Sequence, residues 1–154
     1  MPKVLRLHTL PEDEKILRAP NAEVNFPLTV EIKELIEDMK LTVRKAPGIG
    51  LAAPQVGHNL MLAIIHLEEF GIESFALINP KVISRSIKKT ALEEGCLSIP
   101  KVFGDVKRPA KVEVVGFTED GRKVHLKGEK LFAKVLQHEI DHLNGILIQD
   151  KFEK

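Results

Sequence analysis

The sequence predicts an α+β fold in which short antiparallel or mixed β-sheets pack around a central C-terminal helix, with another helix towards the N-terminus. Two stretches, residues 29–45 and 129–144, repeat their apolar residues with the period of a helix. Between them lie several short extended segments, which argues against a repeating βαβ sheet. The 154 residues, 44% of them hydrophobic, are enough for one core, so we expect residues 1–154 to form a single domain.

Two helical segments are predicted in the N-terminal third. Residues 12–17 can form a short helical turn before Pro20. A longer helix is expected over residues 29–45, with Thr29 as its N-cap. The apolar residues on one face of this helix are Ile32, Leu35, Ile36, Met39 and Val43. We expect that face to be buried.

The central part of the sequence predicts strands, and the C-terminal part predicts the last helix. Strands are expected over residues 60–65, 75–79, 89–92, 111–117 and 122–126. The last two flank Glu119, Asp120 and Gly121, a sequence typical of a hairpin turn. The final helix is expected over residues 129–144, and Gly145 follows it where a left-handed residue commonly ends a helix.

Composition excludes several classes of protein. The 23 basic and 22 acidic residues leave a net charge of +1, which gives no signal for nucleic-acid or membrane-surface binding. No apolar stretch reaches the length of a membrane span, and the first ten residues lack the pattern of a secretory signal. A single cysteine allows no internal disulfide and suits a reducing compartment. We therefore expect a cytoplasmic protein.

The strongest chemical signal is the segment from His138 to His142, which reads His-Glu-Ile-Asp-His within the last predicted helix. Histidines four residues apart lie on one helical face, so both imidazoles can reach one metal ion, and Glu139 can reach a water molecule at such a site. The alternative is a set of polar residues on a solvated face. The surrounding helix is apolar, however, and buried polar groups need partners. Asp141 could support a ligand imidazole from behind, although its rotation about the helix disfavours this.

A third metal ligand has to come from upstream, because no histidine or cysteine follows His142. Cys96 is the best candidate, since the adjacent Gly95 permits a close backbone approach. Taken alone, a single cysteine is more often a small buried thiol. The weaker alternatives are the histidines and carboxylates at other positions: His8, His58, His66, His125, Asp150 and Glu153.

A glycine-punctuated segment, residues 48–57, follows the first long helix. By itself it is more typical of a tight structural turn than of a binding site, and it lacks the features of a phosphate-binding or dinucleotide-binding loop. Its paired glycines and small alanines could also let an extended peptide pass close to the backbone. Gln55 would then offer an amide donor to a developing oxyanion.

Taken together, the three motifs resemble the peptide deformylase family. The family pattern, with Φ for an apolar residue, is G-Φ-G-Φ-A-A-x-Q, E-G-C-Φ-S and H-E-x-x-H, and residues 48–55, 94–98 and 138–142 match it throughout. The resemblance implies a single catalytic domain that removes the N-terminal formyl group from formyl-methionine of new polypeptides and releases formate. It implies Cys96, His138 and His142 as metal ligands and Glu139 as the general base and acid.

The resemblance also implies how a substrate is held. Gln55 and the backbone N–H of Leu97 would stabilise the oxyanion, while the segment with Ile49 and Gly50, together with Gly95, would pair with the substrate backbone. The residues implied to line the methionine pocket are Ile49, Leu92, Leu131 and Val135. Lys134 departs from the pattern, because some members carry an apolar residue there. We expect its stem to pack at the pocket rim with the ammonium in water.

The cofactor and partners follow from the same resemblance. One thiolate and two imidazoles accept Fe²⁺, Zn²⁺, Co²⁺ or Ni²⁺, and the resemblance favours one Fe²⁺ per chain. The implied partners are N-formylmethionyl nascent peptides, with transient ribosome association and a monomeric enzyme. A metallopeptidase and a metal-stapled binding module remain the competing hypotheses. The first normally draws a third ligand from downstream, and the second needs a closed set of four ligands.

Overall fold

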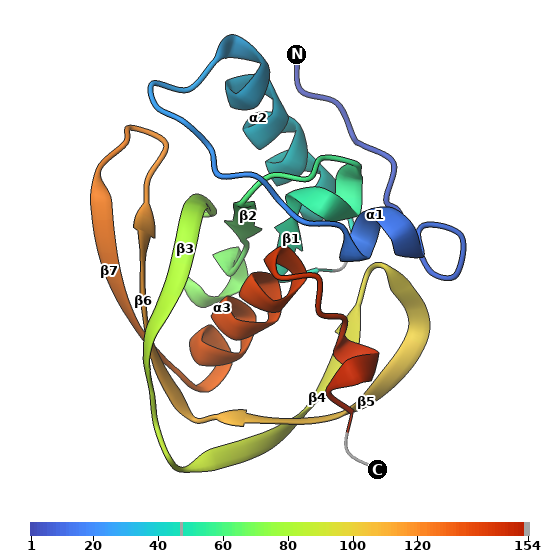
Figure 1. Cartoon of the computed structure of the whole chain (residues 1–154), viewed down its shortest axis with the longest axis vertical. Coiled ribbons are helices and arrows are strands. Elements are labelled where there is room, and N and C mark those ends of the chain that lie inside the picture. The colour runs from blue at the N-terminus through green and yellow to red at the C-terminus, as the bar shows by residue number, and fades with distance from the viewer. Residues whose placement is uncertain (47, 153–154) are drawn as a thin grey trace.

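The last helix, α3 (Lys130–Leu143), is the central element of the molecule. The computed structural model describes residues 1–46 and 48–152. In it, α3 lies between a five-stranded sheet on one side and a two-stranded hairpin on the other (Figure 1). The arrangement is the α+β architecture expected from the sequence, and every strand pairing within the two sheets is antiparallel.

The five-stranded sheet has the order β1-β2-β3-β6-β7. Its strands are β1 (Gly50–Ala52), β2 (Leu62–Ile65), β3 (Phe75–Arg85), β6 (Lys111–Phe117) and β7 (Lys123–Glu129). The hairpin of β4 (Lys89–Cys96) and β5 (Ile99–Pro109) is inserted between β3 and β6. The insertion extends away from the sheet and brings the end of β4 towards α3 (Figure 1).

The helices form largely where the sequence predicts them. The short helix α1 covers Glu14–Arg18 and α2 covers Val30–Lys45. The hydroxyl of Thr29 accepts a hydrogen bond from the backbone N–H of Ile32, so Thr29 is the N-cap of α2 as predicted. Gly145 has φ +75°, which confirms the left-handed residue expected after α3.

The strands are more extensive than predicted. Strand β3 continues past Asn79 to Arg85, because a register shift after Ile78 lets it resume pairing with β6. Strand β4 continues to Cys96, and β5 was not predicted at all. Much of the hairpin is exposed, so its sequence lacks the apolar alternation that marks a half-buried strand. The glycine-punctuated segment forms β1 and the 3₁₀ helix η1 (Ala53–Val56).

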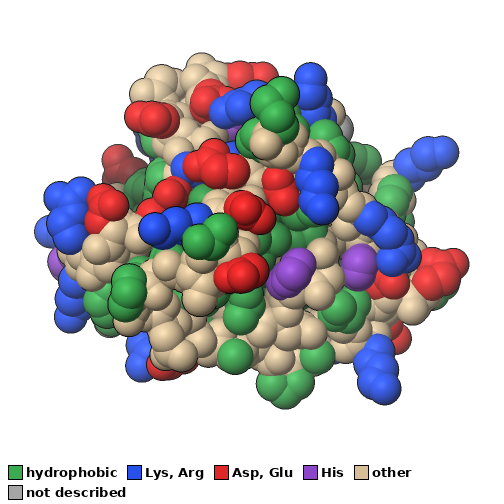
Figure 2. Space-filling model, turned by 90° about the horizontal axis from the view of Figure 1, so that it is seen from above, with side chains coloured by type: hydrophobic (Ala, Val, Ile, Leu, Met, Phe, Trp, Pro, Cys, Tyr) green, Lys and Arg blue, Asp and Glu red, His purple; other side chains and the backbone are tan. Residues whose placement is uncertain are grey.

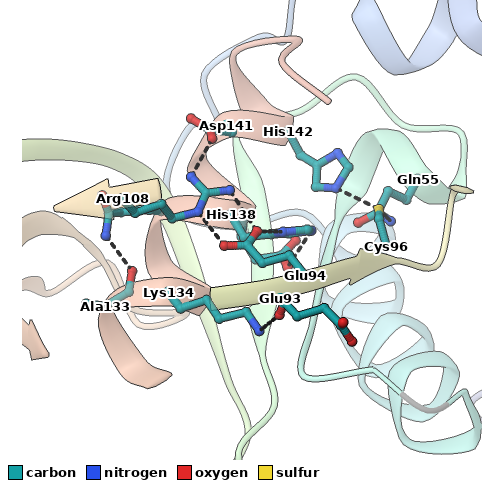
Figure 3. A network of polar contacts seen from close by, with 12 residues as sticks. Gln55, Glu93, Glu94, Cys96, Arg108, Ala133, Lys134, His138, Asp141 and His142 are labelled. Carbon is teal, nitrogen blue, oxygen red and sulfur yellow. Dashed lines mark hydrogen bonds and ion pairs between the residues drawn. The ribbon is translucent and has the colours of Figure 1, made fainter. Parts of the chain in front are cut away.

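The apolar face of α3 packs on the five-stranded sheet. Val135 and Leu136 are fully buried in a cluster that includes Leu77 and Val114 from the sheet. Burial of side chains of this kind stabilises a fold by about 1.5–3 kcal/mol each. The face of α3 with its two histidines is thereby turned towards the β4–β5 hairpin (Figure 3).

The surface agrees with the balanced composition. Acidic and basic side chains are interspersed on the face drawn in Figure 2, in keeping with the net charge of +1. Within the described part of the chain, no helix is both long enough and apolar enough to cross a membrane.

Candidate metal and catalytic site

Two segments that are distant in sequence supply one cluster of metal-ligating groups. Cys96 stands at the end of β4, while His138 and His142 lie one turn apart on α3 (Figure 3). The ligand atoms of these three residues all lie within 4.8 Å of one another. Cys96 Sγ is 3.1 Å from His142 Nε2, and the two imidazole centroids are 4.9 Å apart. The sequence-predicted ligands therefore come together.

The electrostatics of the cluster suit a divalent cation. Burial lowers the pKa of His142 well below its ordinary value, and the charges of His138 and Arg108 lower it further, so its imidazole is neutral. Burial acts the same way on His138, but its contacts with Cys96 and Glu94 outweigh it and raise its pKa to about 10. The groups around His138 thus favour positive charge at this point. A bound metal cation can supply this positive charge, and a thiolate with two imidazoles is a suitable set of ligands for it.

Glu139 lies beside the cluster with its carboxylate buried. The residue is only 2% exposed, and its Oε2 is 4.0 Å from His138 Nε2. Its Oε1 is buried without a hydrogen-bond partner among the described residues. Burial raises the pKa of Glu139 to about 7, although the charges of His138 and Arg108 oppose this. A carboxyl group with such a pKa can take up and return a proton near neutral pH.

The carboxylate of Glu139 fits against Gly50 on β1. A Cβ atom at Gly50 would lie 2.6 Å from Glu139 Oε2, closer than real Cβ contacts allow. The second glycine of the segment thus provides the space in which the Glu139 side chain sits. The segment is therefore part of the site rather than only a turn.

Gln55 is held so that its amide N–H₂ group faces the cluster. Its Oε1 accepts a hydrogen bond of 2.9 Å from the backbone N–H of Ala52. This bond fixes the amide orientation, and Nε2 donates to Ser98 Oγ at 3.1 Å and lies 3.6 Å from Cys96 Sγ. A donor positioned in this way can stabilise negative charge that develops near Cys96.

An ion-pair network behind His138 was missed in the sequence. Glu94 Oε1 lies 3.1 Å from His138 Nδ1, while Arg108 contacts both Glu94 oxygens at 2.6 and 2.9 Å and Asp141 at 2.8 Å (Figure 3). Burial raises the pKa of Glu94, but hydrogen bonds from His138 and Arg108 outweigh it and hold the pKa at about 2. A carboxylate on the far nitrogen fixes the orientation of a ligand imidazole. Glu94 supplies this carboxylate, whereas Asp141 binds Arg108.

A cavity of about 480 Å³ opens beside the cluster. The residues that line it are Gly48, Ile49, Gly50, Gln55, Glu93, Gly95, Cys96, Leu97, Pro100, Lys101, Phe103, Lys134, His138 and Glu139. Most of the motif residues for which the sequence analysis gives a catalytic or binding role thus line the same cavity.

Comparison with known proteins agrees with this geometry. The sequence matches the polypeptide deformylase family over residues 4–154. A peptide deformylase from Microchaete diplosiphon is 42% identical over 151 residues, which cover 97% of this chain and 79% of the relative. The chain belongs to the polypeptide deformylase family.

Solved deformylase structures share the fold and confirm the predicted α+β class. The peptide deformylase of Synechococcus elongatus in complex with actinonin has a TM-score of 0.88 at 43% identity, and the match covers 97% of this chain and 79% of that chain. The Met-Ala-Ser-bound class I type b peptide deformylase of Acinetobacter baumannii has a TM-score of 0.90 at 30% identity, and the match covers 99% and 100%.

Three residues expected to line a deformylase methionine pocket lie elsewhere in this structure. Leu92 is 41% exposed and lies in a separate hollow with Glu94 and Arg108, because side chains alternate between the two faces of β4. Val135 is fully buried in the core, and Leu131 packs against the same core cluster. Ile49 contacts that cluster and also lines the cavity. Leu131 and Val135 therefore belong to the apolar core against which Ile49 packs, and not to the wall of the cavity.

Lys134 lies where the sequence predicts it in this deformylase, at the cavity. Its ammonium is not simply solvated, because Nζ donates a hydrogen bond of 2.8 Å to the carbonyl oxygen of Glu93 (Figure 3).

The alternative ligands considered in the sequence take other partners. His66 contacts Ser74 at 2.6 Å and His125 contacts Glu113 at 3.2 Å. His8 packs against Gly57, and neither it nor His58 belongs to the metal-ligating cluster found among the described residues. Asp150 pairs with Arg18 at 2.8 Å, and Glu153 lies outside the described residues. These contacts leave Cys96, His138 and His142 as the candidate ligand set.

Proposed function

We propose that this chain is a metal-dependent amidohydrolase that removes the formyl group from N-formylmethionyl peptides and releases formate. One divalent metal per chain would be held by Cys96, His138 and His142. The observation that carries the proposal is the position of this ligand cluster beside the buried carboxylate of Glu139, at the wall of an open cavity. Three protein ligands leave a position open for chemistry, whereas a structural site would be closed by four.

A bound divalent metal would supply a Lewis acid and lower the pKa of water at the site. Glu139 accepts a proton from the attacking water as its oxygen bonds to the formyl carbon. The same carboxyl group then returns the proton to the nitrogen of the leaving amine, so that the C–N bond breaks and formate and a free amino terminus remain. The pKa of about 7 that burial gives Glu139 suits both transfers.

The negative charge that develops on the formyl oxygen needs donors. Gln55 Nε2 is already oriented towards Cys96, and Leu97 lines the cavity in the turn between β4 and β5. We assign the Gln55 amide and the backbone N–H of Leu97 as the oxyanion donors. Each donor of this type contributes about 3 kcal/mol to transition-state stabilisation in comparable sites.

The substrate would bind as an extended strand between β1 and β4. Gly50 and Gly95 present their backbones to the cavity from its two sides, and Ile49 offers an apolar surface for the methionine side chain. Strand addition of this kind derives affinity from main-chain hydrogen bonds. The Acinetobacter baumannii relative that binds Met-Ala-Ser supports a peptide of this sequence as the product.

We propose Fe²⁺ as the native metal, on the family resemblance, with Zn²⁺, Co²⁺ and Ni²⁺ as ions that the same ligands accept. An iron–thiolate site would be sensitive to oxygen and peroxide. The proposed substrates are nascent peptides, so we place the enzyme in the cytoplasm as a monomeric single domain with transient ribosome association.

The test is anaerobic purification, metal analysis and a formate-release assay on formyl-Met-Ala-Ser, with unblocked Met-Ala-Ser beside it. We expect one metal per chain and formate from the blocked peptide alone. The matched control is Glu139→Gln, which should keep its metal and lose activity by several orders of magnitude. Formate from neither protein would refute the proposal, and cleavage of the unblocked peptide would favour a metallopeptidase instead.

A further inference from the structure

Strand β4 has one edge paired with β5 and one edge that faces the cavity. Just before β4, the carbonyl of Lys88 accepts a hydrogen bond of 2.9 Å from Ala110 N–H. In an antiparallel pair every second residue of a strand is hydrogen-bonded to the partner strand, so this bond shows which residues of β4 are bonded to β5. Leu92 and Glu94 lie an even number of residues from Lys88, so their backbone groups also point to β5. Glu93 and Gly95 direct theirs to the free edge.

The free edge is where a peptide would be added. Both Glu93 and Gly95 line the cavity, and Cys96 follows Gly95 directly. A peptide whose reacting end lies at Cys96 and whose backbone pairs with Gly95 therefore extends along the edge towards Glu93. Because pairing recurs every second residue, the next pairing position on β4 is Glu93.

That next position is already occupied. Lys134 reaches across from α3, and its Nζ donates to the Glu93 carbonyl at 2.8 Å (Figure 3). A substrate N–H would have to displace an ammonium group from this oxygen, and hydrogen bonds from ionised donors are stronger than those from neutral amides. Lys134 itself lines the same cavity and is half-buried there.

We propose that Lys134 ends the substrate-pairing edge of β4 at Glu93, so that this enzyme binds the backbone of only the first few residues of a peptide. The proposal rests on the proposed function and assigns Lys134 as a specificity-determining residue for peptide length. Residues beyond the one that would meet Glu93 add nothing to binding. A protein edge strand that is blocked by a lysine resists further strand addition in the same way.

The test is a series of formylated peptides, extended from formyl-Met-Ala-Ser to six residues with alternating Ala and Ser. The kcat/KM of the wild type should stay within about twofold from three residues to six. Lys134→Met keeps the length of the side chain and removes the ammonium. In this variant kcat/KM should rise about two- to tenfold over the same series, mainly through KM, which is the effect of one additional hydrogen bond.

Lys101→Met is the matched control, because Lys101 also lines the cavity but its ammonium makes no hydrogen bond to β4 among the described side-chain contacts. It should keep the wild-type length profile. Lys134→Ala provides a second variant should Lys134→Met be poorly folded, as judged by thermal unfolding. Equal length dependence in the wild type and both Lys134 variants would overturn the assignment while the proposed function stands. No formate from formyl-Met-Ala-Ser with the wild type would overturn both.

Discussion

Replacing Gly50 with alanine places a methyl group against the carboxylate of Glu139. An ideal Cβ at Gly50 would lie 2.6 Å from Oε2 and 2.9 Å from Cγ and Cδ of Glu139, where ordinary contact begins near 3.4 Å. The carboxylate would therefore have to move by about 0.8 Å. Glu139 is only 2% exposed and lines the cavity, so its carboxylate can move only into that cavity or against the candidate metal ligands, and either shift takes it out of its catalytic position. A misplacement near 1 Å at a catalytic group costs about a hundredfold in rate, or about 2.7 kcal/mol.

The assay is formate release under anaerobic conditions, with metal content and thermal unfolding measured on the same sample. We expect Gly50→Ala to bind its metal and fold while kcat falls about a hundredfold. Gly71→Ala is the control, because nothing lies within 4 Å of its Cβ position but its φ is +81°. That variant should lose about 1–2 kcal/mol of stability and keep its activity. A folded, metal-loaded Gly50→Ala with wild-type kcat would refute the reasoning.

Three further predictions concern the ion pair behind His138 and the candidate ligand Cys96. Arg108→Met leaves the carboxylate of Glu94, which is 1% exposed, without its guanidinium partner. Urea unfolding should therefore show that the free energy of unfolding falls by about 3–5 kcal/mol, and a fall of less than about 1 kcal/mol would contradict this. The wild-type pKa of Glu94 is about 2 instead of 4.5, because hydrogen bonds from His138 and Arg108 outweigh burial. Stability from this group is present above about pH 4.5 and should be lost as pH falls towards 2, with the acid transition of Arg108→Met at higher pH. Cys96→Ser should leave well under one metal per chain after dialysis, and full retention would exclude the thiolate as a ligand.

The ligand cluster could be predicted from the sequence because its parts are local. Two histidines four residues apart share a helical face whatever the tertiary structure is, and Cys96 is the single cysteine of the sequence. Arg108 could not be found in this way. It reaches Glu94 only through the pairing of β4 with β5, and its position on β5 opposite Thr90 depends on a hairpin that the sequence did not indicate.

The residues that lie outside the cavity, against expectation, have a similar explanation. Leu92 was expected beside the substrate because the family resemblance implied it. Adjacent residues of a strand, however, direct their side chains to opposite faces. The bulge between Gly95 and Cys96 therefore changes which of the preceding side chains lie on the same face as Cys96. Val135 and Leu131 lie on α3, the helix that also carries the two histidines, but their side chains pack against the core cluster at the five-stranded sheet instead of facing the cavity. Helical periodicity predicts a buried face without indicating what covers it.

The packing explains why three motifs that are weak separately are specific together. Gly50 of the first motif makes room for Glu139 of the third, and Gly48 makes room for Leu97 of the second, since a Cβ there would lie 2.9 Å from the leucine Cδ1. Gln55 of the first motif orients its amide towards Cys96 of the second. Each motif therefore provides a space or a partner that another requires. A chance occurrence of one motif creates no need for the others, whereas the folded site needs all three at once.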